Sequence, residues 1–154
     1  MRRKGRHIML AVGSDHGGFT LKKEILRHLD EKGVAYKDFG TYSEDSCDYP
    51  DIAEPVARAV AAGECERGIL ICGTGVGMSI SANKVRGIRA ALCGDCYTAE
   101  YTRRHNDANI LTLGARVLGG GLALKIVDIF LDTAFDGGRH ARRVGKIADI
   151  ESRN

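Results

Sequence analysis

The chain has 154 residues, of which 44% are hydrophobic and 28% are charged, and its formal net charge is +3. This length fits one domain with a sizeable core, the hydrophobic share excludes a disordered chain, and the 20 glycines lack the triplet period of collagen. Four of the positive charges lie within residues 1–6, so the remainder is nearly neutral and is not suited to bind nucleic acid by bulk charge. We expect residues 1–6 to be a disordered basic extension and residues 7–154 to form one domain.

Cysteine usage and the longest apolar run bear on the compartment. The five cysteines are scattered and odd in number, and the sequence shows no secretory signal, which favours a reducing cytoplasm over a disulfide framework. The longest apolar run, near 122–131, is interrupted by Lys125 and Asp128 and is far shorter than the roughly 20 apolar residues of a membrane helix. We therefore expect a cytoplasmic protein that binds neither a membrane nor nucleic acid.

Short β-branched runs alternate with amphipathic stretches along the chain. Leu21, Ile25 and Leu29 recur at helical spacing until Gly33 stops the helix, whereas Arg67–Cys72 is a continuous apolar run of the kind found in a central parallel strand. The patterns predict, in chain order, a strand at 7–13, a helix from 21 to 33, a strand at 34–39, a helix at 50–62, a strand at 67–72, a helix at 78–83, a strand at 88–93, a helix at 97–104, a strand at 109–113, and helices at 122–135 and from 139 onward.

Five strand-helix repeats with short connections indicate an α/β fold. We predict a single doubly wound, Rossmann-like domain with a five-stranded parallel sheet, helices on both faces and a C-terminal helical extension. The stretch 122–135 is apolar on more than one side, which exceeds what a helix with one solvent-exposed face carries. We interpret that surplus as a subunit interface. In doubly wound sheets the ligand site lies beyond the carboxyl ends of the strands.

The third predicted strand ends in the block CGTGVGMS, Cys72–Ser79. Three glycines at alternate positions before a helix expose backbone N–H groups, which together with the helix dipole favour an anion, either a phosphate or a developing oxyanion. The same field favours a thiolate at Cys72, which makes this residue a candidate base. The alternative is a small buried strand residue, as most free cysteines are.

The first predicted strand ends in GSDHGG, Gly13–Gly18. Glycines let a backbone approach a ligand, and Asp15 and His16 are suited to hydrogen-bond a sugar or a phosphate. The alternative is an Asx-type turn that caps a helix beside an incidental histidine.

Nucleotide binding is a further alternative. The Walker A pattern is absent, and the GxGxxG fingerprint fails because its last glycine falls on Met78. Asp95, near the end of the fourth strand, would suit a ribose hydroxyl, so a nucleotide or sugar-phosphate binding module stays open at this stage.

Two polar clusters follow later in the chain. His105, next to Asn106, is either a C-cap at the end of its helix or a general acid-base beside an amide donor. On a helix from 139, the side chains of four basic residues would form one stripe that suits a phosphate or a solvated face, and a further arginine after the fifth strand could join it. These residues are Arg139, Arg142, Arg143, Lys146 and Arg116.

Together these pieces suit proton abstraction next to a carbonyl of a phosphorylated small molecule. No metal-ligand cluster is evident in the sequence, and we expect neither a metal nor a cofactor.

At this point the sequence resembles the B-type ribose-5-phosphate isomerases, which share a fold with the galactose-6-phosphate isomerase subunits. The matching blocks run in order across nearly the whole chain. They are GSDHGGF (13–19), DYPD (48–51), CGTGVGMSISANK (72–84), RRHNDANIL (103–111), LGARVLG (113–119) and GGRHARRV (137–144).

The resemblance implies interconversion of ribose 5-phosphate and ribulose 5-phosphate through an enediolate, without metal. It implies that Cys72 moves the proton between C2 and C1, that His105 opens the furanose ring, and that Thr74 helps the loop amides to hold the enediolate oxygen. Some members carry a glutamate base where this chain has Val76, so the cysteine branch is indicated. The residues implied to bind substrate are Asp15, His16, Gly73, Thr74, Gly75, Val76, Gly77, Asn106, Arg116, Arg139 and Arg143.

The resemblance also implies a dimer or tetramer of identical chains with sites between subunits. It implies no role for Arg142 and offers no counterpart for residues 1–6. Isomerisation of a six-carbon aldose phosphate such as allose or galactose 6-phosphate uses the same chemistry and stays open.

Overall fold

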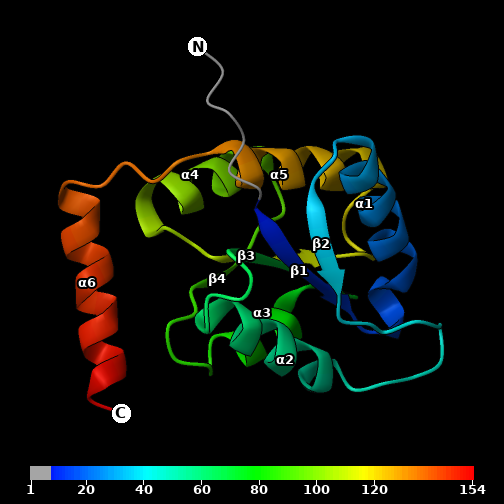
Figure 1. Ribbon diagram of the computed structural model, residues 1–154, viewed down its shortest axis with the longest axis horizontal. Coiled ribbons are helices and arrows are strands. Elements are labelled where there is room, and N and C mark those ends of the chain that lie inside the picture. Colours follow the sequence, from blue (N-terminus) through cyan, green and yellow to red (C-terminus); the bar gives the residue numbers. More distant parts are fainter. Residues whose placement is uncertain (1–7) are drawn as a thin grey trace.

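The computed structural model of the protein describes residues 8–154 (Figure 1), so the extension predicted at 1–6 lies outside the described residues. The strands are β1 (Met9–Ser14), β2 (Ala35–Asp38), β3 (Arg67–Cys72), β4 (Ala90–Leu92) and β5 (Ile110–Gly114). The helices are α1 (Phe19–Glu31), α2 (Tyr49–Ala61), α3 (Val76–Ala82), α4 (Cys96–Asn106), α5 (Gly120–Asp132) and α6 (Arg139–Ser152), and one 3-10 turn covers His16–Gly18.

The strands form one parallel sheet in the order β2-β1-β3-β5-β4, which confirms the predicted α/β fold. Helices α1, α4 and α5 cover one face, and α2 and α3 cover the other, above and below the sheet in Figure 1. From β1 the chain passes to β2 on one side and returns to β3 on the other. The winding therefore reverses between β1 and β3, and in such sheets the ligand site lies at the carboxyl ends of the strands that flank the reversal.

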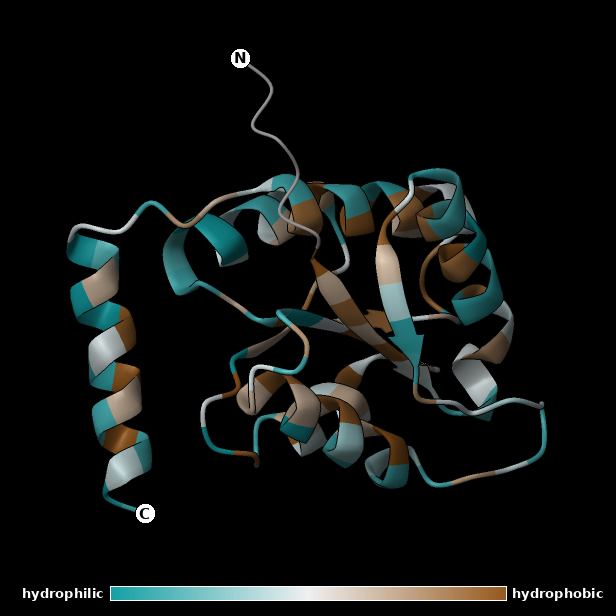
Figure 2. Cartoon of the chain, viewed as in Figure 1, coloured by the Kyte–Doolittle hydropathy of each residue, from teal (hydrophilic) through white to brown (hydrophobic). Residues whose placement is uncertain are grey.

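The burial of the elements follows the sequence patterns. The central strands are apolar on both sides and are buried between two hydrophobic clusters, seen as brown segments inside the teal outer surfaces in Figure 2. In α1 the predicted residues Leu21, Ile25 and Leu29 face the sheet. β4 begins at Ala90, two residues later than predicted. The amide of Arg89 donates to the side-chain oxygen of Asn109 (2.8 Å) instead of to a backbone carbonyl of a neighbouring strand.

The apolar surplus of 122–135, from which we predicted a subunit interface, is partly used within the chain, and the interface itself stays a prediction. Ile126, Val127 and Phe130 are fully buried within the chain, and Ile129 packs against the same cluster. Only Leu122 among the large apolar residues of α5 stands out as exposed, at 40%. Helix α5 contacts α1 and α4 as well as the sheet, so three neighbours in its own chain use the surplus apolar surface.

Helix α6 stands apart from the three layers (Figure 1) and is attached near both of its ends. Near its start, the His140 ring stacks on the His105 ring of α4. Near its end, the Glu151 carboxylate accepts a hydrogen bond from the amide of Gly87 (3.1 Å). Between them the helix exposes Ile147. Among residues 8–154, no helix combines the length and the apolar character needed to cross a membrane.

Candidate active site

The glycine loop between β3 and α3 is shaped by close backbone packing. Gly75 has φ +79°, and a Cβ there would lie 2.8 Å from the Leu113 carbonyl carbon. A Cβ on Gly114, at the end of β5, would lie 2.6 Å from the Thr74 carbonyl oxygen. Only glycines allow the loop to rest against the end of β5 in this conformation. As a result, α3 begins at Val76, two residues before the predicted start.

The Cys72 thiol lies at the carboxyl end of β3, beneath this loop. The residue is 4% exposed, and its Sγ accepts a hydrogen bond from the backbone amide of Gly75 at 3.2 Å. The backbone N–H of the loop is thus aimed at the sulfur atom. The structure therefore places Cys72 at the carboxyl edge of the sheet beneath the glycine loop, and its role as a base stays a prediction.

Two other cysteines are poor candidates for a base. Burial raises the pKa of the Cys93 thiol to about 11, and burial likewise raises the pKa of Cys65. Both thiols therefore stay protonated near neutral pH. Sequence reasoning overlooked the Cys-x-x-Cys spacing of Cys93 and Cys96, which is present in the chain. All five cysteines are free thiols.

A cavity of about 380 Å³ opens beside Cys72 at the switch point of the sheet. It brings together seven of the predicted site residues, from the end of β3, the glycine loop, α3 and the turns after β1 and β5. Sequence reasoning missed two further lining residues, Tyr49 and Ile80, although Tyr49 lies in the DYPD block. The lining comprises Asp15, Tyr49, Cys72, Gly73, Thr74, Val76, Gly77, Ile80 and Arg116.

Asp15 and Arg116 supply the charged groups of this cavity. The Asp15 carboxylate is buried and accepts a hydrogen bond from the Gly18 amide (3.1 Å), so the predicted turn cap is present. The Arg116 guanidinium lies over the glycine loop, with Nη1 3.2 Å from the position of a Cβ on Gly73. A Cβ on Gly17 would lie 3.3 Å from Asp15 Oδ1 and 3.6 Å from Arg116 Nη2, so the Gly17 backbone borders both charged groups. One cation and one carboxylate thus meet at the loop.

A hydrogen bond from the backbone selects the tautomer of the neutral His16 ring. Its Nδ1 accepts a hydrogen bond from the Cys47 amide at 3.2 Å. In the neutral imidazole the proton is therefore on Nε2, which is free to donate to a phosphate or a hydroxyl.

The remaining predicted residues lie at the other edge of the sheet. β3 and β5 pair from Gly68 with Ile110 to Cys72 with Gly114, and the strand between these pairs rises about 13 Å. Cys72 is the last residue of β3 and lies at the carboxyl edge of the sheet. His105 comes before β5 in the chain and lies at the amino edge. Within one chain, the structure therefore does not bring Cys72 together with the set formed by His105, Asn106, Arg139 and Arg143.

His105 lies in an aromatic stack that joins α4 to α6. Its ring lies 4.0 Å from the His140 ring, at an interplanar angle of 7°, and meets the edge of Tyr101 at 4.9 Å. Burial lowers the pKa of His140, and the neighbouring positive charges of His105, Arg139 and Arg143 lower it further.

The ligand atoms of His105, Asp136 and His140 lie within 4.8 Å of one another, as a metal site would require. The Asp136 carboxylate, however, is held by Arg104 Nε at 3.2 and 3.3 Å. A divalent cation would have to displace Arg104 and enter a strongly positive field, so the cluster does not fit a metal.

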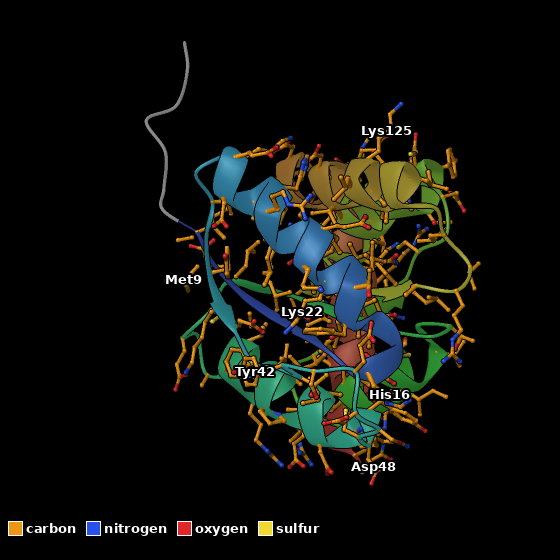
Figure 3. All side chains as sticks on the ribbon, turned by 90° about the vertical axis from the view of Figure 1, so that its right-hand side faces the viewer. Met9, His16, Lys22, Tyr42, Asp48 and Lys125 are labelled. Atoms are coloured by element: carbon orange, nitrogen blue, oxygen red, sulfur yellow. The ribbon has the colours of Figure 1, made fainter. Side chains whose placement is uncertain are left out.

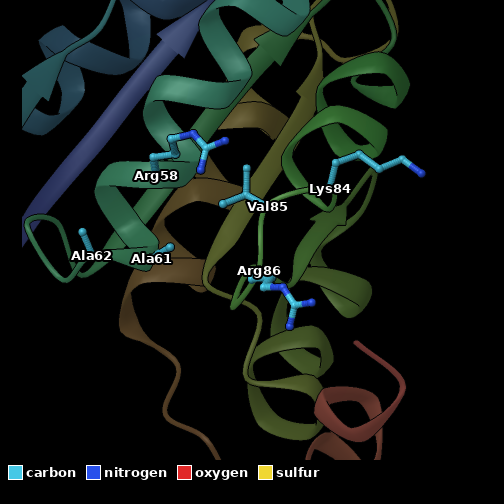
Figure 4. A pocket seen from close by; sticks show the side chains of 6 residues that line it. All are labelled: Arg58, Ala61, Ala62, Lys84, Val85 and Arg86. Carbon is cyan, nitrogen blue, oxygen red and sulfur yellow. The ribbon is translucent and has the colours of Figure 1, made fainter. Parts of the chain in front are cut away.

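A larger cavity, of about 560 Å³, lies between α2 and the segment after α3 (Figure 4). Its charged residues are Arg58, Lys84 and Arg86. Arg58 is paired with Glu54 at 2.7 Å, and Arg86 donates to the carbonyl oxygen of Asn154 at 2.9 Å. The six residues that line it include no thiol, hydroxyl, imidazole or carboxylate, so the smaller cavity at Cys72 is the candidate active site.

The fold and the site define a class: a doubly wound α/β protein whose cavity, at the switch point of its sheet, holds a thiol beneath a glycine loop. The family model for Ribose/Galactose Isomerase matches residues 10–147, and the chain belongs to that family.

Individual relatives cover nearly the whole chain. Ribose-5-phosphate isomerase B of Escherichia coli (strain K12) is 54% identical over 94% of this chain and 97% of its own. The solved structure of ribose-5-phosphate isomerase B from Clostridium thermocellum has a TM-score of 0.94 at 57% identity and covers 95% of this chain and 99% of its own. That of the Mycoplasma genitalium enzyme with bound ribulose 5-phosphate has a TM-score of 0.91 at 44% identity and covers 95% of this chain and 97% of its own.

Proposed function

We propose that the protein interconverts D-ribose 5-phosphate and D-ribulose 5-phosphate through an enediolate. The observation that carries this proposal is the Cys72 thiol, which lies beneath a glycine loop in a cavity that also holds Asp15 and Arg116. Family membership and relatives named for this activity support the same reaction.

In the proposed mechanism, Cys72 moves the proton between C2 and C1 of the open-chain sugar. A proton beside a carbonyl is weakly acidic, so the enediolate oxygen needs donors that are already in place. Within Gly73–Gly77, the amides of Gly73, Thr74 and Gly77 can supply them, because those of Gly75 and Val76 already donate to Cys72 Sγ and to the Thr74 hydroxyl oxygen. The hydroxyl of Thr74 adds another, because its oxygen accepts from the Val76 amide (3.2 Å) and its proton is therefore free to donate.

Ring opening and phosphate binding require groups from both edges of the sheet. We assign the acid-base step of ring opening to His105, a sugar contact to Asn106, and the phosphate to Arg116 and His16 together with Arg139 and Arg143. Because one chain separates these groups from Cys72, the proposal requires a second copy of the chain that contributes His105 and the start of α6.

We therefore propose a homo-oligomer with sites shared between subunits. The exposed apolar side chains of α6 favour it, since Ile147 is 48% and Ile150 is 56% exposed on a helix that leaves the body of its own chain. The reaction as proposed needs no metal, and the five free cysteines favour a cytoplasmic location.

The activity is tested by following ketose formation from ribose 5-phosphate with the purified protein. Cys72→Ala should fold normally and lose turnover by orders of magnitude, because the cavity holds no second thiol and its one carboxylate, Asp15, is engaged by the Gly18 amide. Near wild-type turnover in this variant would contradict the role of Cys72, and a wild-type protein without ketose formation would contradict the activity. Parallel assays with allose 6-phosphate and galactose 6-phosphate decide between five- and six-carbon sugars.

The shared site is tested by mixing two inactive variants, Cys72→Ala and His105→Ala, after dissociation and reassembly. A mixed dimer holds one doubly altered site and one intact site, so random pairing should restore about a quarter of wild-type activity. Recovery of no activity, with mixed dimers shown by mass spectrometry, would contradict a site built from two chains.

A further inference from the structure

Lys22 on α1 is a buried cation outside the cavity. It is 1% exposed, and its ammonium donates to Asp38 Oδ1 at 2.7 Å and to the Thr41 carbonyl oxygen at 2.6 Å. The ammonium also lies 5.1 Å from the centre of the Tyr42 ring. Burial of a charge is costly unless partners replace the lost water, and here all of these partners belong to the segment 38–42.

Figure 3 shows Lys22 between α1 and the segment that carries Tyr42, on the same side of the molecule as His16. The ammonium thus links the helix to this segment, which leaves the end of β2 and crosses the end of β1.

The segment 38–42 holds the last residue of β1 by its backbone. The amide of Ser14 donates to the Gly40 carbonyl at 2.7 Å, and the amide of Thr41 donates to the Ser14 carbonyl at 2.7 Å. Asp38 Oδ1 accepts from the Gly40 amide at 2.9 Å as well as from Lys22. Both backbone groups of Ser14 are therefore fixed by residues that Lys22 holds, and the next residue is Asp15 of the cavity.

The same stretch of chain continues into the cavity. Cys47 donates its amide to His16 Nδ1, and Tyr49, the first residue of α2, lines the cavity. A Cβ on Gly77 would lie 2.8 Å from the Tyr49 ring, so this ring rests directly on α3. The segment after β2 therefore meets the candidate site at Asp15, His16 and Tyr49.

We propose that Lys22 is a positioning residue for substrate binding, which acts through Thr41 and Ser14 on Asp15 and through the 42–48 loop on His16 and Tyr49. This inference rests on the proposed function. Among residues 8–154, no hydrogen bond or ion pair joins Lys22 to a residue that lines the cavity, yet it is the cation that fixes the segment bordering it.

A second cluster on the same helix gives a matched control. Near the end of α1, Asp128 of α5 accepts from His28 Nε2 at 2.8 Å and from Lys32 Nζ at 2.7 Å. This cluster also ties α1 to its surroundings, but Asp128 is on α5, and among the described residues no hydrogen bond or ion pair joins it to the 38–49 stretch.

The test compares Lys22→Met, the double variant Lys22→Met with Asp38→Asn, and the control Asp128→Asn. In the double variant no carboxylate is left without its cation, and the new amide still offers an oxygen to Gly40. This variant therefore removes the donation to Thr41 at a smaller cost in stability, and it keeps the test valid where Lys22→Met alone does not fold.

We expect both Lys22 variants to raise KM at least tenfold and to lower kcat/KM by about 100-fold, the loss that a displacement near 1 Å produces. The amides of Ser14 and Thr41 should lose hydrogen-exchange protection, whereas iodoacetamide should alkylate Cys72 at the wild-type rate because β3 is not displaced. Asp128→Asn should lower Tm and leave KM unchanged.

The inference is overturned if the double variant keeps wild-type KM, or if Ser14 and Thr41 keep their protection. Failure of the proposed function is a separate result, a wild-type protein that forms no ketose. In that case the hydrogen-exchange comparison still decides whether Lys22 holds the segment next to Asp15.

Discussion

Gly114→Ala tests whether the position of the glycine loop depends on the end of β5. The new Cβ would lie 2.6 Å from the Thr74 carbonyl oxygen and 2.8 Å from the Thr74 carbonyl carbon. Both are backbone atoms that no rotamer change can move. To reach an ordinary contact of 3.4 Å, the loop must shift by about 0.8 Å relative to β5.

The expected loss of kcat/KM in Gly114→Ala follows from the proposed role of the glycine loop in holding the enediolate oxygen. A displacement near 1 Å of groups that act on the transition state costs up to about 100-fold in rate, so kcat/KM should fall by one to two orders of magnitude. Overpacking costs about 1–3 kcal/mol of stability, and each kcal/mol lowers Tm by roughly 2–4 °C for a domain of this size. The variant should therefore stay folded at 25 °C.

Steady-state kinetics and a thermal melt measure both effects in one preparation. Gly121→Ala is the matched control, because a Cβ there meets nothing within 4 Å. It should keep wild-type kinetics and gain up to about 1 kcal/mol from the helix preference of alanine. Wild-type kcat/KM in Gly114→Ala would refute the reasoning, since the loop would then tolerate a shift that the proposed catalysis does not allow.

Three further predictions follow from the site. Arg139→Ala and Arg143→Ala should each raise KM more than they lower kcat, because a phosphate contact is present throughout the reaction; unchanged KM in both would remove them from the phosphate site. Activity should survive dialysis against a chelator, and loss that zinc or magnesium restores would contradict the metal-free mechanism. Brief iodoacetamide treatment at pH 8, read by mass spectrometry, should label Cys65 and Cys93 least, because burial raises the pKa of both thiols.

Much of the fold could be predicted because its signals are local. The apolar run at Arg67–Cys72 and the spacing of Leu21, Ile25 and Leu29 each specify one element, and strand-helix alternation then specifies a parallel sheet. The glycine block was informative for a similar reason: only close backbone packing, as at Gly75, requires so many glycines in one turn.

The sequence could not show which neighbours an element has. The apolar surplus of α5 was assigned to a second subunit because the pattern does not reveal that α1 and α4 flank this helix. Lys22 has the sequence context of an exposed lysine on an amphipathic helix, and its burial depends on the segment 38–42, which folds back over α1. Tyr49 was missed because its partner at the cavity, Gly77, is distant in sequence.

The division of the site between two edges of the sheet has a topological cause. In a strand-helix repeat, every residue that follows a strand lies at the carboxyl edge, and every residue that ends a helix before the next strand lies at the amino edge. Cys72 ends β3, and Asp15 and Arg116 follow β1 and β5, whereas His105 lies in the last turn of α4, before β5. Loop rearrangement cannot carry His105 across a buried sheet to Cys72. A reaction that uses both residues therefore needs two chains, and this constraint makes assembly a requirement for the proposed activity.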